Sequence, residues 1–438
     1  MRKYFVLCII LLSFSLTGCG NRSSLDFSVT RLVLPNGLTV LIHEKPNLPL
    51  VAIKAAIKTG SLYEPEEKAG IANFVAGMLT RGTKNWSAEA IASKIDFVGG
   101  KLATGSRRDR GYAACELLAK DLDLGLEILS EVLTSPTFDP QEIEKERSLL
   151  LAEVSAYQDD PRMVAKMAYD ELIYGKHPYH RPVAGYVKTI KNLSRQDLVA
   201  FHQKYYLPNN TLLAIVGDID TEKLIRKIKD KFGKWERKPL VLPIFPAVLS
   251  QSAIKRKSIL MKKEQTQILL GNLGIRRNYP DYYALQLLDE ILGGDLSARI
   301  FYNLRDRLGL AYSAYSNITG SAGLEPGEFL AYIAVSPSNK DKAIAGLLAE
   351  IERIRNEPVT SEELQNAKDY LTGSYYFDFQ RNIDLADYLI FCENYALGFD
   401  YLKKYPTYIK GVTIADLQRV AQKYLHPQAY SVVVVGSR

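Results

Sequence analysis

The chain has 438 residues, of which 47% are hydrophobic and 24% are charged, and its formal net charge is +7 at pH 7. This composition is typical of a folded globular protein, and the length exceeds what one hydrophobic core usually serves, so we expect two or more domains. The positive charge is small for this length, and no basic block is interleaved with aromatic residues, which argues against nucleic-acid binding.

The N-terminus has the pattern of a secretion signal. Two basic residues precede an apolar run over residues 4–16, which is too short to span a membrane comfortably. The sequence LTGC that follows, ending at Cys19, resembles a bacterial lipobox. It predicts a signal peptide over residues 1–18, a lipid on Cys19 and a lipid-anchored leash over residues 19–27, which would place the protein at the bacterial cell envelope, on the periplasmic side in a Gram-negative cell. The alternative is an ordinary secretory signal with an incidental cysteine.

The next elements predict an α+β fold. A Pro-Asn-Gly turn divides two apolar runs within residues 31–43, which is a strong hairpin signal, and residues 51–58 read as another strand. Helical patterns follow over residues 88–98, 121–134 and 140–157. Strands followed by grouped helices favour a largely antiparallel sheet with helices covering one face.

Residues 70–83 carry a helical pattern with an unusual polar face. Apolar residues recur at i, i+3, i+4, i+7 and i+8, as in a helix packed on a core: these are Ile71, Phe74, Val75, Met78 and Leu79. Asn73, Ala76 and Gly77 fall together on another face. Paired histidines with an intervening glutamate at such positions bind zinc and activate water, but these three residues offer no such chemistry.

The segment resembles the zinc helix of the pitrilysin/insulinase-like metallopeptidases, whose frame is G-hydrophobic-A-H-x-x-E-H-M-L-x-x-G-T. The positions that fit the frame are Gly70, Ala72, Met78, Leu79, Gly82 and Thr83. By this resemblance, Asn73 and Gly77 stand at the histidine positions and Ala76 at the glutamate position. Glu153 would hold the vestigial position of the third zinc ligand, with Glu146 as its accessory. The alternative is two ordinary helical glutamates beside a neighbouring cation.

No other stretch supplies a substitute site. Among the five histidines, His177 and His180 come nearest to a ligand pair, but Pro178 makes their segment a turn, so a surface or capping role is expected. There is no G-x-S-x-G motif, and Cys115 and Cys392 have apolar surroundings, so nucleophilic catalysis has no anchor. Whether these two cysteines pair is left open.

The chain repeats itself at a constant offset of 219 residues. The triplet QKY ending at Tyr205 returns at Tyr424, and each copy is followed by a proline and a β-rich run that ends in Val-Gly. We therefore expect two homologous lobes, over residues 28–233 and 253–438, joined by a proline-containing linker over residues 234–252. The family resemblance covers nearly all of residues 28–438 and implies that the two lobes form a half-shell.

A second specific stretch spans residues 292–313. Gly293 and Gly294 end one helix, and a new helix from about Ser297 leads into a strand near Ala311. Arg305 and Tyr312 stand seven residues apart across that junction and resemble the family's arginine–tyrosine pair, which binds the substrate backbone. The alternative is a salt bridge from the arginine and a tyrosine packed in a core.

Together these features predict a chain that is not an enzyme on its own. The resemblance implies a non-catalytic subunit of a heterodimeric zinc metalloendopeptidase. A homologous partner would carry the zinc, and this chain would bind peptide or unfolded protein through Arg305 and Tyr312. A lipid-anchored peptide-binding scaffold or chaperone without a role in hydrolysis is the alternative, and an independent peptidase with a relocated metal site is a third possibility.

Overall fold

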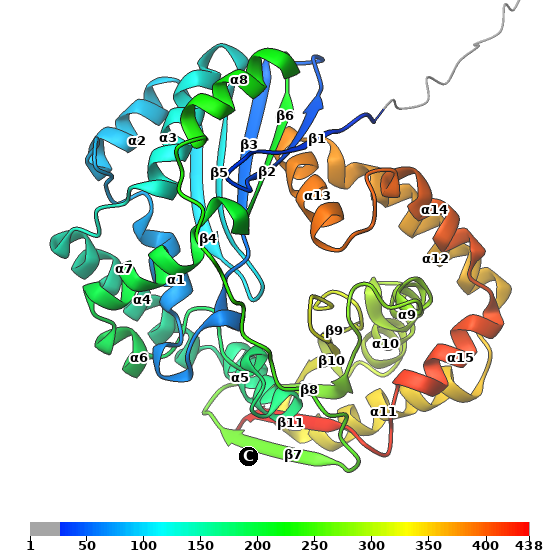
Figure 1. Ribbon diagram of the computed structural model, residues 1–438. Coiled ribbons are helices and arrows are strands. Elements are labelled where there is room, and N and C mark those ends of the chain that lie inside the picture. Colours follow the sequence, from blue (N-terminus) through cyan, green and yellow to red (C-terminus); the bar gives the residue numbers. More distant parts are fainter. Residues whose placement is uncertain (1–26, 438) are drawn as a thin grey trace, which may run out of the picture.

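The computed structural model describes residues 27–437, which form two β-sheets that each carry their own helices. The elements follow a curved, ring-like course, with the first sheet and its helices on one side and the second on the other (Figure 1). Cys19 and the expected signal peptide lie outside the described residues, so the lipid anchor stays a prediction. Within residues 27–437, none of the helices combines the length and the apolar character needed to span a bilayer.

The first sheet has six strands in the order β1-β2-β6-β3-β5-β4. Strands β2 and β6 run parallel, and the other neighbouring pairs are antiparallel. A turn at Gly37, whose φ is 92°, joins β1 to β2 and confirms the predicted hairpin. The strands are β1 (Thr30–Val33), β2 (Thr39–Glu44), β3 (Leu50–Ile57), β4 (Lys101–Ser106), β5 (Gly111–Leu118) and β6 (Thr211–Gly217).

The helices of the first lobe include the three that the sequence predicted between residues 88 and 157. Asp-Pro pairs start the two longest: the carboxylates of Asp139 and Asp160 accept backbone N–H groups of the first turn, and proline fixes the backbone at the first helical position. The helices are α1 (Ile71–Met78), α2 (Ala88–Phe97), α3 (Leu122–Thr134), α4 (Pro140–Asp159), α5 (Pro161–Tyr174), α6 (Val187–Asn192), α7 (Arg195–Tyr205) and α8 (Thr221–Phe232).

The second sheet has five strands in the order β7-β11-β8-β10-β9, which is the order of the first sheet without β1. Its strands are β7 (Lys255–Leu260), β8 (Thr266–Leu273), β9 (Ala311–Asn317), β10 (Glu328–Val335) and β11 (Ser431–Gly436). Its helices are α9 (Tyr282–Asp289), α10 (Arg299–Phe301), α11 (Lys340–Asn356), α12 (Ser361–Ser374), α13 (Asn382–Asn394), α14 (Tyr401–Gly411) and α15 (Ile414–Tyr424). Wider turns, η6 (Glu290–Gly294) and η7 (Tyr302–Arg307), extend α9 and α10.

The sequence repeat corresponds to a repeat in structure. Helices α7 and α15 begin with the same reciprocal cap, in which Ser194 pairs with Asp197 and Thr413 with Asp416. Each helix is followed by a strand, β6 or β11, that runs parallel to one neighbouring strand and antiparallel to the other. The mixed fold with two helix-covered sheets is therefore as predicted. No helix or strand lies between Phe232 and Lys255, the stretch that contains the predicted linker.

Each sheet is also covered on its second face, by a helix from the other half of the chain. In β6, Leu213 and Ile215 belong to the core of the first lobe, whereas Ala214 and Val216 point to the opposite face. There they pack with Leu389 of α13. Figure 1 shows this helix beside the first sheet, although its sequence lies deep in the second half.

Helix α5 makes the reciprocal contact. Its Tyr169 lies in one apolar cluster with Leu269 of β8 and Val433 of β11, while the alternate strand residue Ile268 faces the helices of the second lobe. The Tyr169 hydroxyl donates to the carbonyl of Phe329 on β10. Helices α5 and α13 occupy corresponding places in the two repeats, so the lobes are joined by an exchange of equivalent helices.

A buried polar cluster reinforces this junction. Glu328 of β10 accepts a hydrogen bond from the Tyr174 hydroxyl at 2.5 Å and lies 3.0 Å from the Lys166 ammonium, both on α5. Arg108 lies 3.0 Å from Asp170 and 3.5 Å from Glu328. Burial works against the charged form of Glu328, but the two cations outweigh it and lower the pKa of this carboxyl to about 2.

Asp281 gives a pH-dependent prediction for the second lobe. It precedes α9, is 8% exposed, and accepts from Tyr424, Lys423 and Arg419 at 2.6, 2.9 and 2.8 Å. Burial raises the pKa of this carboxyl, but the hydrogen bonds outweigh it and lower the pKa to about 2. The stabilisation is therefore present above the unfolded pKa near 4 and is lost as the pH falls toward 2. In denaturant titrations, Asp281→Asn is expected to lower the free energy of unfolding by about 2 kcal/mol at pH 7 and by less than about 0.5 kcal/mol at pH 2. An equal loss at both pH values contradicts this.

Candidate functional site

Helix α1 contains the three positions that the sequence singled out. Its N-terminus is fixed by Gly70, whose φ of 93° favours glycine, and by the buried carboxylate of Glu64, which accepts from the backbone N–H groups of Gly70 and Ala72 at 2.9 and 2.8 Å. Burial raises the pKa of Glu64 to about 7, against these hydrogen bonds. The predicted apolar stripe is buried, so the helix is held firmly in the first lobe.

The polar face of α1 offers no metal-ligand side chains, and a carboxylate of α4 lies against it. Asn73 is half-buried and Ala76 is buried. At Gly77, an added Cβ would overlap the Oε1 atom of Glu146, so the carboxylate of α4 already occupies the space where a histidine side chain would begin. Glu146 is held there by Arg81, whose Nη2 donates to Oε2 at 2.7 Å. The residues present do not fit zinc.

Glu153 does not join this cluster. It lies on α4 two turns beyond Glu146, is exposed, and accepts a hydrogen bond from the Tyr157 hydroxyl at 2.5 Å. This hydrogen bond is the main reason that the pKa of Tyr157 is raised to about 12. The two glutamates of the acidic motif therefore have different hydrogen-bond partners in the structure, Arg81 for Glu146 and Tyr157 for Glu153.

The histidines and cysteines that the sequence offered as metal ligands or nucleophiles are part of the packed structure. In the described part of the chain, no group of three or more His, Cys, Asp or Glu side chains could hold a metal ion. His177 is buried and its Nδ1 accepts the backbone N–H of Tyr179, which starts a short turn over Pro178–His180, and burial lowers the pKa of His177 to about 4. Cys115 and Cys392 are both buried and are not bonded to each other.

A double-mutant cycle can test the role of Glu146. Gly77→Ala is expected to lower the free energy of unfolding by about 1 kcal/mol, because the new Cβ displaces Glu146 from Arg81. In a Glu146→Ala background, the same change is expected to raise it by about 1 kcal/mol, because alanine is the better helix former. Denaturant titrations of the four proteins measure both effects. The same sign in both backgrounds contradicts the packing of Glu146 against Gly77.

Arg305 and Tyr312 are brought together at the edge of the second sheet. Arg305 lies on η7 and Tyr312 on the edge strand β9, close to the positions that the sequence predicted for the new helix and strand. The guanidinium carbon is 5.6 Å from the centre of the Tyr312 ring and 4.6 Å from that of Phe301. Tyr312 is 79% exposed, so it is not a core residue, and the ion pair from Arg305 to Asp306 is long, at 3.5 Å. Both side chains are available to a ligand.

Sequence reasoning missed two participants in these sites. Arg81, one helical turn beyond Gly77, holds Glu146, and only its i+4 spacing from Gly77 offered a signal. Phe301 supports the Arg305 guanidinium from the preceding turn. In the loop before α10, Asp295 accepts from the backbone N–H and hydroxyl of Ser297 at 2.7 and 2.8 Å.

Comparisons with known proteins agree with this architecture. Residues 39–186 match the family model described as insulinase (peptidase family M16), and residues 192–371 match the one described as peptidase M16 inactive domain. The chain is 30% identical over 353 residues to an uncharacterised zinc protease of Rickettsia felis, covering 80% of this chain and 83% of that protein. The chain belongs to the insulinase family of peptidases. The predicted resemblance is therefore confirmed.

Two solved structures share the fold of this chain. A peptidase M16 inactive domain from Pseudomonas fluorescens is 24% identical, with a TM-score of 0.87 over 94% of this chain and 98% of that one. A protease from Helicobacter pylori is 22% identical, with a TM-score of 0.88 over 93% of this chain and 99% of that one. At these identities the likeness concerns the two-lobed fold alone.

Proposed function

We propose that this member of the insulinase family is a non-catalytic subunit of a heterodimeric zinc metalloendopeptidase. The observation that carries the proposal is a contrast between the two lobes. The first lobe keeps α1 but fills its polar face with Glu146 and Arg81, while the second lobe presents Arg305 and Tyr312 together and exposed. A homologous partner would bear the zinc and activate water, and this chain would bind the peptide and wall the chamber.

The chemistry of the exposed pair suits a peptide backbone. A guanidinium and a phenol can each donate to a peptide carbonyl, and they can stabilise the oxyanion that forms when the carbonyl is attacked. Stacking of Arg305 on two aromatic rings limits the positions of its guanidinium. The pair would therefore hold a substrate without contributing a nucleophile or a metal.

The edge of the first sheet offers a second peptide contact. Strand β4 pairs with β5 on one side, and no strand of the described chain pairs with its other side. An extended peptide can add to such an edge through main-chain hydrogen bonds. Unfolded proteins and flexible peptides, which reach an extended conformation easily, are the substrates that this edge favours.

The proposal places the protein at the bacterial cell envelope. This localisation is proposed from the sequence LTGC, in which Cys19 would become the lipidated N-terminus, and from the short leash over residues 19–27. Labelling cells with a radioactive fatty acid tests this part. Incorporation into the wild type and its loss in Cys19→Ala are expected, and equal labelling of both proteins contradicts a lipid at Cys19.

Reconstitution tests the subunit role. The purified chain is mixed with a zinc-bearing homologue from the same genome, and cleavage of an unfolded protein is measured beside each protein alone. We expect a complex in size-exclusion chromatography and a large gain in activity, with zinc found only in the partner. No gain in activity contradicts the proposal, and a complex without gain points to the scaffold role. One tightly bound zinc ion per copy of the isolated chain contradicts the assignment of the metal to the partner.

A further inference from the structure

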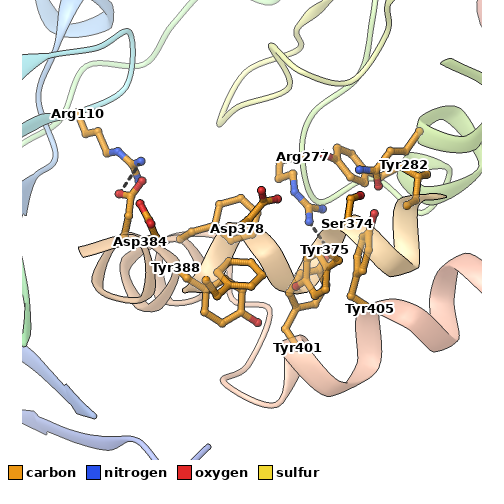
Figure 2. A pocket seen from close by; sticks show the side chains of 15 residues that line it. Arg110, Arg277, Tyr282, Ser374, Tyr375, Asp378, Asp384, Tyr388, Tyr401 and Tyr405 are labelled. Carbon is orange, nitrogen blue, oxygen red and sulfur yellow. Dashed lines mark hydrogen bonds and ion pairs between the residues drawn. The ribbon is translucent and has the colours of Figure 1, made fainter. Parts of the chain in front are cut away.

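A pocket in the second half of the chain has no place in the proposed peptidase role. Its volume is about 380 Å³, and it lies between the start of α9 and the helices α12, α13 and α14, with Arg110 of the first lobe at one side (Figure 2). The walls are largely aromatic. They include Tyr282, Tyr375, Tyr401 and Tyr405, which Figure 2 shows on the same side as Arg277.

Arg277 is the unusual member of this pocket. Its side chain is 4% exposed, yet in the described residues no carboxylate lies within ion-pairing distance of it. Its Nη2 donates to the Tyr401 hydroxyl at 2.6 Å, and its buried Nε has no acceptor. The guanidinium carbon lies 3.8 Å from the centre of the Tyr282 ring and 4.9 Å from that of Phe391.

A buried guanidinium in this state lacks a counter-ion. Aromatic faces offset part of the cost of burying the charge, but a guanidinium has five N–H donors and is most stable when an anion accepts from it. Arginine pairs with carboxylates through strong charge-assisted bonds, and aromatic walls favour a flat apolar group. The pocket therefore combines the two features that an aromatic carboxylic acid requires.

The acidic residues of the pocket do not neutralise Arg277, and two of them are already paired. Asp384 lies 2.7 Å from the guanidinium of Arg381. Asp387 lies 2.9 Å from Lys54 and 3.1 Å from Arg110. Asp378 is exposed at the rim of the pocket and has no ion pair within the described chain. Its charge would weaken the binding of an anion.

We propose that this pocket binds a carboxylate on Arg277 and an aromatic group against its tyrosine walls. The ligand class is an aromatic carboxylic acid, either a free small molecule or the C-terminal residue of a peptide. Of these two ligands, only the peptide C-terminus rests on the proposed function. The binding itself is a property of the isolated chain, so it can fail or succeed without reference to activity in a complex.

Calorimetric titration of the isolated full chain tests the proposal with matched ligands. The probes are N-acetyl-phenylalanine and its amide, which lacks the carboxylate, followed by a five-residue peptide ending in phenylalanine as acid and as amide. We expect both acids, or the small acid alone, to bind saturably, and each amide to bind at least about tenfold more weakly. Binding of both acids identifies a peptide C-terminus as the source, and binding of the small acid alone identifies a free acid. Equal binding of acid and amide, or no binding of either acid, overturns the proposal.

Substitutions locate the site. Arg277→Gln is expected to weaken binding of the acid at least about tenfold, and Asp378→Asn to strengthen it by about twofold to fivefold, because it removes a negative charge from the rim. Glu362→Gln, an exposed change on α12 outside the pocket, is the control and should leave affinity unchanged. If Arg277→Gln does not fold, the affinity of Asp378→Asn tests the proposal instead, because Asp378 is exposed and its substitution should not prevent folding. An affinity unchanged or lowered in Asp378→Asn overturns the proposal.

Discussion

Replacing Leu389 by alanine is expected to lower the free energy of unfolding by about 3 kcal/mol. Leu389 is fully buried on α13, where it packs against the second face of the first sheet with Ala214 and Val216 of β6. The surrounding strands belong to a rigid sheet, so the cavity left by the missing methyl groups cannot close completely. Chemical denaturation followed by circular dichroism measures the loss.

The position of Leu389 also predicts where the protein opens. Because α13 joins the second half of the chain to the first sheet, a weakened contact should loosen the largely exposed segment between the sheets, and limited proteolysis within residues 234–252 is expected to become faster. Leu149→Ala, on α4 and 56% exposed, is the control and should change stability by less than about 0.5 kcal/mol. A similar loss in both variants contradicts the exchange of helices as a source of stability.

The main features of the fold could be predicted from the sequence because they are local. The hairpin before Glu44 follows from its Pro-Asn-Gly turn, and the predicted helix α4 begins at an Asp-Pro pair whose carboxylate caps it. The duplication was readable because its most similar part, α7–β6 and α15–β11, returns at a constant spacing. These signals depend on near neighbours in the chain, which is why their elements lie close to the predicted residues.

The exchange of α5 and α13 could not be predicted, because an apolar face does not specify its partner. A partial signal was present: the runs TLLAIVG and EFLAYIAV, which form β6 and β10, are apolar without alternation, as expected for strands buried on both faces. The pattern shows that a second layer exists, but only the tertiary structure shows that the other lobe supplies it.

The difference between local signals and long-range contacts also applies to the residues of the candidate sites. Asn73, Ala76 and Gly77 could be singled out because a helix fixes their relative positions. The carboxylate that fills their face comes from Glu146, about seventy residues later, and no periodicity links it to α1. The pocket around Arg277 draws its walls from Arg110 to Tyr405, so its unpaired charge could be recognised only after folding.

Arg305→Ala and Tyr312→Phe are each expected to lower kcat/KM of the reconstituted complex by about 10²-fold, if the pair donates to the reacting carbonyl. Removal of one such donor weakens the transition state more than the bound substrate, so kcat should fall more than KM rises. Tyr312→Phe keeps the ring that Arg305 contacts and removes only the hydroxyl, and it therefore separates hydrogen bonding from packing.

The exposure of the pair makes a purely structural explanation testable. Tyr312 is 79% exposed and Arg305 has only a long ion pair, so neither change should alter the free energy of unfolding by more than about 0.5 kcal/mol. Tyr408→Phe, 40% exposed on α14, serves as the matched control and should leave activity within about twofold. If Tyr312→Phe keeps full activity while Arg305→Ala loses it together with stability, Arg305 supports the strand edge and the pair does not bind substrate. If both variants lose activity and keep their stability, the second lobe contributes half of a shared active site.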